Sequence, residues 1–244
     1  MKQVIVIPAR MKGTRLPGKP LINIDGKPMI KHIWDRALLV HNRENIFVAT
    51  EDQIIKDYCT KNDINCLMTP KANTAIDRVK LFSDVIKADS YINLQGDEPV
   101  FNIQDLKTIL DYNKQFPKRI VFGKAECNEE EFNDFSKAKV VCDLNNKLLY
   151  SSRAGIPVNN KGNFVKAHRA IWLYAFDKKS LNKYYEYSKG TPLETIEDNE
   201  IIRFLEIGIE VYCVDMIGDS WAVDEVKDIE IVIKKIKNEK NCNY

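Results

Sequence analysis

The stretch that decides the fold is Gln3–Ala9, with the sequence QVIVIPA, together with the loop of residues 10–20 (RMKGTRLPGKP) that follows it. The first segment is almost continuously apolar, which is typical of a strand buried on both faces of a parallel sheet. The loop holds two glycines, two prolines and four Lys or Arg residues, so it cannot form a helix and presents backbone and positive charge. The chain therefore opens with a buried strand that ends in a basic loop.

Strands and helices alternate beyond this point. We expect strands at residues 45–50, 64–69, 90–95, 119–124, 139–144, 147–152, 168–176 and 209–215. We expect helices at residues 28–40, 51–62, 75–88, 103–115, 178–188, 192–207 and 225–239. This alternation predicts right-handed crossovers and a parallel sheet covered by helices on both faces. The Asn145-Asn146 turn predicts an antiparallel hairpin, so the fold class is α/β with a mixed, mostly parallel sheet.

The chain has 244 residues and no linker or repeat, so we expect a single domain over residues 1–244. The hairpin would lie in an inserted subdomain at about residues 125–190. A formal net charge of +2 does not favour a nucleic-acid or membrane partner. No apolar run reaches the roughly 20 residues of a membrane span, and no signal peptide precedes the first strand, which predicts a cytoplasmic location. Six cysteines and three histidines lack zinc-site spacing.

The basic loop superficially matches a P-loop, because Gly13 and the Gly18-Lys19 pair have the G-x-x-x-x-G-K spacing. Pro20 stands where a P-loop needs Ser or Thr, so that interpretation fails. The loop still carries Arg10, Lys12, Arg15 and Lys19 at the carboxyl end of a strand, where open α/β sheets bind ligands. A solvated basic loop is the simpler alternative. The glycine and proline pattern favours a polyanion such as a nucleoside triphosphate.

Two carboxylates are candidates for a metal site. Asp97 follows an apolar strand directly, and Asp224 precedes the last expected helix. Carboxylates at such positions hold Mg²⁺ against phosphate oxygens, since Mg²⁺ prefers one or two of them plus phosphates and waters. Asp97 could also be an ordinary turn residue, and Asp224 could cap the helix that follows. The residues themselves leave both alternatives open.

Several acidic residues and one histidine are further candidate functional residues in the second half of the chain. Thr191 and Glu194 form a capping box, which explains Glu194 structurally. Glu197, Asp198 and Glu200 are either a solvated helix face or acceptors for the hydroxyl groups of a polyol. His168 opens an apolar stretch, where a lone histidine is usually structural.

The motifs taken together resemble the CMP-Kdo synthetases, which are 3-deoxy-manno-octulosonate (Kdo) cytidylyltransferases. Sugar-1-phosphate nucleotidyltransferases share the G-T-R-L loop but typically begin with L-A-A-G, where this chain has Pro8-Ala9-Arg10. The matching segments, in the family's order across the whole chain, are residues 7–10, 13–21, 25–30, 95–99, 150–157, His168 with Tyr174, 192–197 and 223–224.

The resemblance implies a Rossmann-like nucleotidyltransferase fold and a homodimer formed through the inserted subdomain. It implies that CTP and an acidic sugar, a 3-deoxy-2-ulosonic acid, give a CMP-sugar and pyrophosphate with Mg²⁺ as cofactor. It implies a catalytic group made of Arg10, Arg15, Lys19 and Asp97, and metal ligands Asp97 and Asp224. The implied nucleotide-binding residues are Pro8, Arg10, Gly13, Thr14, Arg15, Lys19, Asn73, Thr74, Arg78 and Gln95. The implied sugar-binding residues are Arg153, His168, Tyr174, Glu194, Glu197, Asn199 and Ile201.

The chain departs from the family pattern in two segments that bear on substrate choice. Residues 70–76 (PKANTAI) lack the family's histidine and S-G-T motif. Asn199 and Ile201 replace a leucine and a glutamine. Ile201 either faces the sugar, which would favour a modified ulosonic acid such as an amino sugar, or faces the core. A transferase for another sugar acid, amino-substituted or nonulosonic, and a catalytically silent homologue that binds nucleotide or sugar are the alternative functions.

Overall fold

The structure is a computed structural model, and it describes residues 1–13 and 16–242. Its strands are β1 (Gln3–Ala9), β2 (Asn23–Ile24), β3 (Lys27–Pro28), β4 (Ile46–Thr50), β5 (Cys66–Met68), β6 (Ser90–Leu94), β7 (Ile120–Cys127), β8 (Lys139–Cys142), β9 (Leu148–Ser152), β10 (Ala167–Phe176) and β11 (Val211–Asp215). Its helices are α1 (Met29–Leu38), α2 (Gln53–Lys61), α3 (Ala75–Val85), α4 (Ile103–Gln115), α5 (Glu129–Asn133), α6 (Lys178–Tyr185), α7 (Pro192–Glu197), α8 (Ile202–Glu206) and α9 (Val226–Cys242), with short 3-10 turns η1 (Lys19–Leu21) and η2 (Arg43–Asn45).

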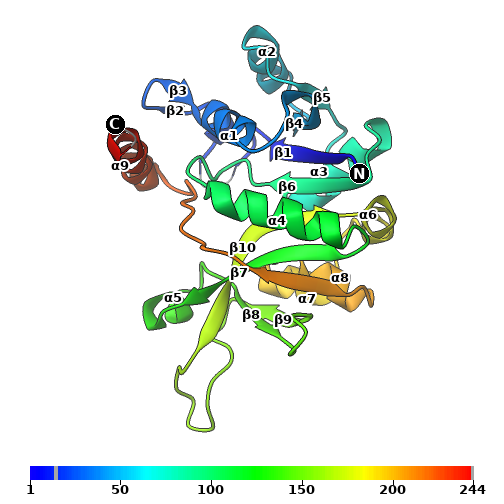
Figure 1. Ribbon diagram of the computed structural model, residues 1–244, viewed down its shortest axis with the longest axis vertical. Helices are drawn as coiled ribbons and strands as arrows, with labels where there is room; N and C mark the ends of the chain where they lie inside the picture. Colours follow the sequence, from blue (N-terminus) through cyan, green and yellow to red (C-terminus); the bar gives the residue numbers. More distant parts are fainter. Residues whose placement is uncertain (14–15, 243–244) are drawn as a thin grey trace.

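The central sheet is mixed and mostly parallel, as the sequence predicts. Its strand order is β11-β7-β10-β6-β1-β4-β5 (Figure 1). β1 pairs in parallel with β4 and β6, and β11 pairs in parallel with β7. β10 runs antiparallel to both β6 and β7 and so joins the two parallel parts into one sheet.

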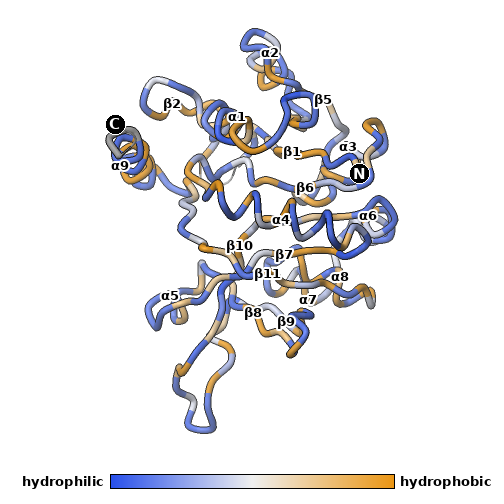
Figure 2. The backbone as a smooth tube through the Cα atoms, in the orientation of Figure 1, coloured by the Kyte–Doolittle hydropathy of each residue, from blue (hydrophilic) through white to orange (hydrophobic). Residues whose placement is uncertain are grey.

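Side chains of β1 alternate between two hydrophobic clusters, one on each face of the sheet. Ile5 and Ile7 pack with residues of α1, α2, α4 and α9, whereas Val4 and Val6 pack with residues of α3, α6 and α8. Figure 2 shows β1 in the hydrophobic colour, next to β6 in the upper part of the view. The helices therefore cover both faces, and the carboxyl ends of the parallel strands are left for the loops that carry the candidate residues.

The predicted hairpin is confirmed. β8 and β9 pair antiparallel, and Asn146 in the connecting turn has φ 60°, a value that asparagine tolerates better than most residues. β8 also pairs with β10, which attaches the hairpin to the central sheet. Figure 1 shows the chain between β9 and β10 as a loop that projects away from the sheet.

The continuous helix predicted over residues 192–207 is wrong. The structure has two helices, α7 and α8, separated at Asp198, whose φ of 46° and ψ of 53° are left-handed. Aspartate and asparagine adopt this conformation more readily than other non-glycine residues, and the amide of Asn199 fixes the break by donating to the hydroxyl of Ser151 at 2.9 Å. The predicted capping box of Thr191 and Glu194 is present at the start of α7.

Candidate active site

The basic loop lines a cavity of about 250 Å³ at the carboxyl ends of β1 and β6. We call it the first cavity. The two strand ends are in close contact, because a Cβ atom at Gly96 would lie 2.1 Å from the carbonyl oxygen of Pro8. Its lining includes Pro8, Arg10, Gly13, Lys19, Thr74, Arg78, Gln95, Asp97 and Asp224. Residues predicted separately from distant parts of the sequence thus meet around one space.

Lys19 links the two candidate metal carboxylates. Its ammonium group donates to Asp97 Oδ2 at 2.9 Å and to Asp224 Oδ1 at 3.1 Å. Burial alone would lower the pKa of Lys19, but the two carboxylates outweigh burial and raise that pKa above its usual value. The pair of carboxylates already holds a cation in this structure. Their oxygen atoms are also the donor type that Mg²⁺ takes beside phosphates.

A main-chain contact brings Asp224 to Asp97. The N–H of Val223 donates to the carbonyl oxygen of Asp97 at 2.9 Å, and Trp221 forms an isolated bridge with Val100. The segment before α9 is therefore fixed against the loop after β6. Within the described residues, no group of three or more His, Cys, Asp or Glu side chains is placed to hold a metal ion. Any metal here would need ligands from a substrate as well.

The nucleotide-binding candidates Thr74 and Arg78 lie at and near the start of α3. Thr74 forms a capping box with Asp77, so the altered segment of residues 70–76 ends in a regular helix start. Arg78 is buried and donates to Thr69 Oγ1 at 2.8 Å and to Glu51 Oε2 at 2.9 Å. Arg78 therefore reaches the first cavity from a fixed position.

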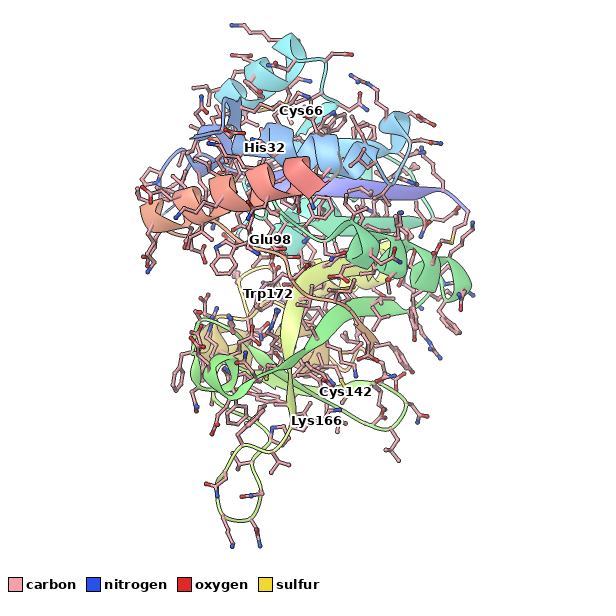
Figure 3. The ribbon with its side chains drawn as sticks, turned by 60° about the vertical axis from the view of Figure 1, so that its left-hand side comes forward. His32, Cys66, Glu98, Cys142, Lys166 and Trp172 are labelled. Atoms are coloured by element: carbon pink, nitrogen blue, oxygen red, sulfur yellow. The ribbon has the colours of Figure 1, made fainter. Side chains whose placement is uncertain are left out.

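A larger second cavity of about 950 Å³ adjoins the first. Six residues line both cavities, namely Arg10, Thr74, Ala75, Gln95, Asp97 and Asp224. The second cavity continues past Glu98 and Trp172, which Figure 3 shows close together at the middle of the molecule. Two ligands bound side by side would therefore meet at Asp97 and Asp224.

Two carboxyl groups of the second cavity have strongly raised pKa values. Burial, reinforced by the carboxylate of Asp97, raises the pKa of Glu98 to about 8. Burial raises the pKa of Glu200 to about 7, although the N–H of Ile76 donates to its carboxylate at 3.2 Å and opposes the shift. Both groups are therefore partly protonated near neutral pH, which reduces the negative charge of the cavity.

Comparison with known proteins places this geometry in a family. The family model described as Cytidylyltransferase matches residues 4–216 of the chain. This chain is a cytidylyltransferase. The 3-deoxy-manno-octulosonate cytidylyltransferase of Koribacter versatilis is 32% identical over 95% of this chain and 89% of its own length. The 8-amino-3,8-dideoxy-manno-octulosonate cytidylyltransferase of Shewanella frigidimarina is 34% identical over 94% of this chain and 96% of its own length.

A solved structure supports the same assignment. A CMP:2-keto-3-deoxy-manno-octonic acid synthetase complexed with CTP superposes with a TM-score of 0.91 at 31% identity, covering 98% of this chain and 100% of that one. The predicted fold class is confirmed by this likeness. The Rossmann-like nucleotidyltransferase fold of the cytidylyltransferase therefore extends over nearly all of the chain.

Four residues predicted to bind sugar do not line the second cavity of the cytidylyltransferase, namely His168, Tyr174, Ile201 and Glu197. Tyr174 and Ile201 are both 0% exposed in the core on one face of the sheet, so the prediction that they contact a substrate is wrong for this structure. Tyr174 stacks between Phe122 and Phe176, which explains its burial. His168 lies on β10 beside β7 and β8 and lines neither cavity.

Other predicted sugar-binding residues of the cytidylyltransferase are engaged within the protein. Glu197 accepts hydrogen bonds from Tyr150, Ser152 and the N–H of Arg153, so it anchors α7 to β9 and does not line the second cavity. Glu194 and Asn199 line the cavity but are buried. Thr14 and Arg15, predicted in the basic loop, lie outside the described residues.

Some residues that line the second cavity were not among the candidates from the sequence. Glu98 follows Asp97 directly in the same motif. Its neighbour was predicted to be a metal ligand, but no function was predicted for Glu98 itself. Trp172 lies within the strand that His168 opens, where β10 has an irregular register between Ile171 and Tyr174. Lys189 belongs to no sequence motif, and it lines the cavity because of the path that the folded chain takes.

Proposed function

We propose that this cytidylyltransferase joins CTP to a 3-deoxy-2-ulosonic acid, Kdo or a close analogue, and releases pyrophosphate. The observation that carries the proposal is the junction of the two cavities at Asp97 and Asp224. CTP would occupy the first cavity, beside the basic loop, and the sugar acid the second. The anomeric hydroxyl of the sugar would then face the α-phosphorus across the junction.

The reaction requires positioning and charge neutralisation, with no covalent enzyme intermediate. The sugar oxygen forms a bond to the α-phosphorus as the bond from this phosphorus to the α,β-bridging oxygen breaks in line. Pyrophosphate leaves with that oxygen and the bond electrons, and the hydroxyl proton passes to solvent water. Arg10 and Lys19 stand at the first cavity, where they can stabilise the charge that builds up on the departing pyrophosphate. The buried position of Arg78 keeps a third positive charge on the same wall.

Mg²⁺ is part of this proposal. Asp97 and Asp224 would hold it, since two carboxylates beside a triphosphate are a donor set that Mg²⁺ takes. The ion would supply charge neutralisation at the phosphates when bound. Lys19 holds the two carboxylates close to each other, because its ammonium group contacts both.

An amino-substituted ulosonic acid is the second candidate substrate. Ile201 lies in the core and gives no support to this choice, but Asp198 and Glu200 place carboxylates on the wall of the second cavity. A carboxylate binds an ammonium group more strongly than it binds a hydroxyl group. The homodimer, the cytoplasmic location and the role of residues 125–190 in association stay predictions.

Pyrophosphate release tests the proposed function. The four nucleoside triphosphates would be combined in turn with Kdo, its 8-amino analogue and a nonulosonic acid, with and without Mg²⁺. We expect release that requires CTP, an ulosonic acid and Mg²⁺ together. Absence of turnover with every pair would refute the enzyme assignment and favour a silent homologue, whereas turnover with a nonulosonic acid alone would refute the substrate class.

A further inference from the structure

The second cavity must neutralise the carboxylate of a sugar acid, although many of its own polar groups are acidic. Six carboxyl side chains line it, those of Asp97, Glu98, Glu194, Asp198, Glu200 and Asp224. The positively charged side chains of its lining are those of Arg10, Arg153, Lys189 and Arg203. The contacts of these four side chains determine which of them is available to an incoming carboxylate.

Arg203 is not available. Its side chain is 0% exposed, and its guanidinium donates to both oxygens of Glu194, at 2.7 and 2.6 Å, and to Asp77 Oδ1 at 2.9 Å. The ring of Tyr184 lies against its remaining face, with the guanidinium carbon 3.9 Å from the ring centroid. Arg203 therefore stabilises the packing of α8 on α3 and α7, and its positive charge is already paired with the carboxylates of Glu194 and Asp77.

Arg153, which the family resemblance assigns to the sugar acid, is also fully engaged. Its Nε donates to the carbonyl oxygen of Glu197 at 2.9 Å, and its Nη1 contacts the carbonyl oxygens of Phe135 and Ser136 at 3.3 and 3.2 Å. Its Nη2 donates to the carbonyl and carboxylate oxygens of Asp198 at 2.8 and 3.2 Å. A guanidinium has five N–H groups, so these five contacts use them all. Arg153 holds the break between α7 and α8 against the segment before β8.

Arg10 and Lys189 remain, and they differ in position. Arg10 follows β1 and lines both cavities, so it stands beside the triphosphate of the proposed reaction. Lys189 lines the second cavity alone. In the described part of the chain its ammonium group makes no ion pair and no hydrogen bond. The backbone next to it is fixed, because Asn73 Nδ2 donates to the carbonyl oxygen of Ser188 at 2.8 Å and Gly190 has φ 95°.

We propose that Lys189 binds the carboxylate of the sugar acid and that Arg153 is a positioning residue for the wall of the cavity. The inference rests on the proposed function. A lysine on a fixed turn presents a point charge that can meet the carboxylate of any ulosonic acid. It also explains how an acidic cavity accepts an anionic substrate, since four of the six carboxylates are already paired with Lys19, Arg153 and Arg203, whereas Lys189 keeps its charge for a ligand.

Steady-state kinetics of Lys189→Met, Lys189→Arg and Lys183→Met test the inference, with Kdo and with the carboxamide of Kdo. Lys183 is an exposed lysine on α6, so Lys183→Met removes one positive charge outside the cavity and is the matched control. We expect Lys189→Met to raise KM for Kdo at least about 10-fold with KM for CTP unchanged, because a charge-assisted hydrogen bond is lost. Lys189→Arg should restore much of the affinity, and Lys183→Met should behave like the native protein.

The carboxamide separates a direct contact from a structural effect. If Lys189 binds the carboxylate, the native enzyme prefers Kdo to the carboxamide and Lys189→Met loses this preference. An unchanged preference in Lys189→Met would overturn the inference, as would loss of the preference in Arg153→Lys with Lys189→Met native-like. No turnover of the native protein with CTP and any ulosonic acid would instead refute the proposed function itself.

Discussion

The carboxylate of Glu200 accepts a hydrogen bond at 3.2 Å from the N–H of Ile76, 124 positions earlier in the chain. Ile76 lies in the first turn of α3, whose start lines the first cavity, and Glu200 itself lines the second. This contact ties the wall of the proposed sugar site to the helix that supports the proposed nucleotide site. The two sites therefore share a structural element as well as the junction at Asp97.

Removing this contact should weaken binding of both substrates. In Glu200→Ala the N–H of Ile76 loses its acceptor at a helix N-terminus, which costs about 1–2 kcal/mol. We expect KM for CTP to rise roughly 5- to 30-fold, together with KM for the sugar acid. Glu200→Gln keeps an acceptor oxygen and should retain most of the affinity for CTP. A native KM for CTP in Glu200→Ala would show that Glu200 serves the sugar alone.

Asp97→Asn should lower turnover by at least ~100-fold, because loss of a metal carboxylate withdraws several kcal/mol of transition-state stabilisation. Asp111→Asn provides a matched control, since Asp111 is exposed on α4. Measurement of kcat at saturating Mg²⁺ decides the question. Near-normal turnover of Asp97→Asn would remove Asp97 from the proposed metal site.

Asp224 and Asp228 should have separable effects. The N–H groups of Asp224 and Glu225 both donate to Asp228 Oδ2 at 2.8 Å, so Asp228 satisfies the backbone before α9 while the side chain of Asp224 contacts Lys19. We expect Asp224→Asn to lose turnover with little change in Tm, and Asp228→Ala to lose about 1 kcal/mol of stability with turnover largely kept. Thermal melts and kcat of the two variants test this. A stability loss in Asp224→Asn without loss of turnover would restore the helix-cap interpretation.

The raised pKa of Glu98 predicts how stability depends on pH. An unfolded glutamate has a pKa of about 4.3, whereas folded Glu98 keeps its proton up to about pH 8. Between these values the folded state binds more protons, so the free energy of unfolding contributed by Glu98 falls as the pH rises. Glu98→Gln should therefore raise Tm at pH 8.5, by roughly 2–4 °C for each kcal/mol gained, and have less effect at pH 5. Glu230→Gln, an exposed change on α9, is the control, and equal shifts at both pH values would contradict the assignment.

Ile201→Gln should destabilise the protein and leave its substrate choice unaltered. The side chain is 0% exposed among apolar neighbours, so an amide there would be buried without an assured hydrogen-bond partner. We expect a loss of about 2–4 kcal/mol in the free energy of unfolding. Ile196 is 78% exposed on α7, and Ile196→Gln should be nearly neutral. A changed ratio of kcat/KM for Kdo and its 8-amino analogue in a stable Ile201→Gln would contradict this placement.

The sequence predicts the parts of the fold that depend on local patterns. The apolar run of β1 and the Asn145-Asn146 turn define a buried strand and a hairpin, and both are present. The break at Asp198 could not be predicted, because the apolar periodicity of residues 192–207 continues across it, and tertiary contacts fix the left-handed turn: Asn199 with Ser151, and Arg153 with the carbonyl oxygens of Glu197 and Asp198.

In the candidate site, too, the residues with a local sequence signal were predicted, and those placed by tertiary structure were not. Lys19, Asp97 and Asp224 were singled out from strand ends and motifs, and the fold brings them together. Ile201 and Tyr174 could not be placed, because the face that a helical or strand residue presents depends on a register that one sequence does not fix. Lys189 has no local signal, since its position on the cavity wall follows from the path of the whole chain.

The contact between Gly96 and Pro8 has a consequence for what can change in this protein. A methyl group at position 96 would collide with a main-chain atom, which no side-chain rotation can relieve. The close approach of the two strand ends therefore requires glycine at position 96, and any larger residue would push the basic loop and Asp97, the proposed phosphate and metal sites, apart. Substitutions on the outer wall of the second cavity could therefore alter the preference for a substrate, while Gly96 would keep constant the spacing of the proposed reacting groups.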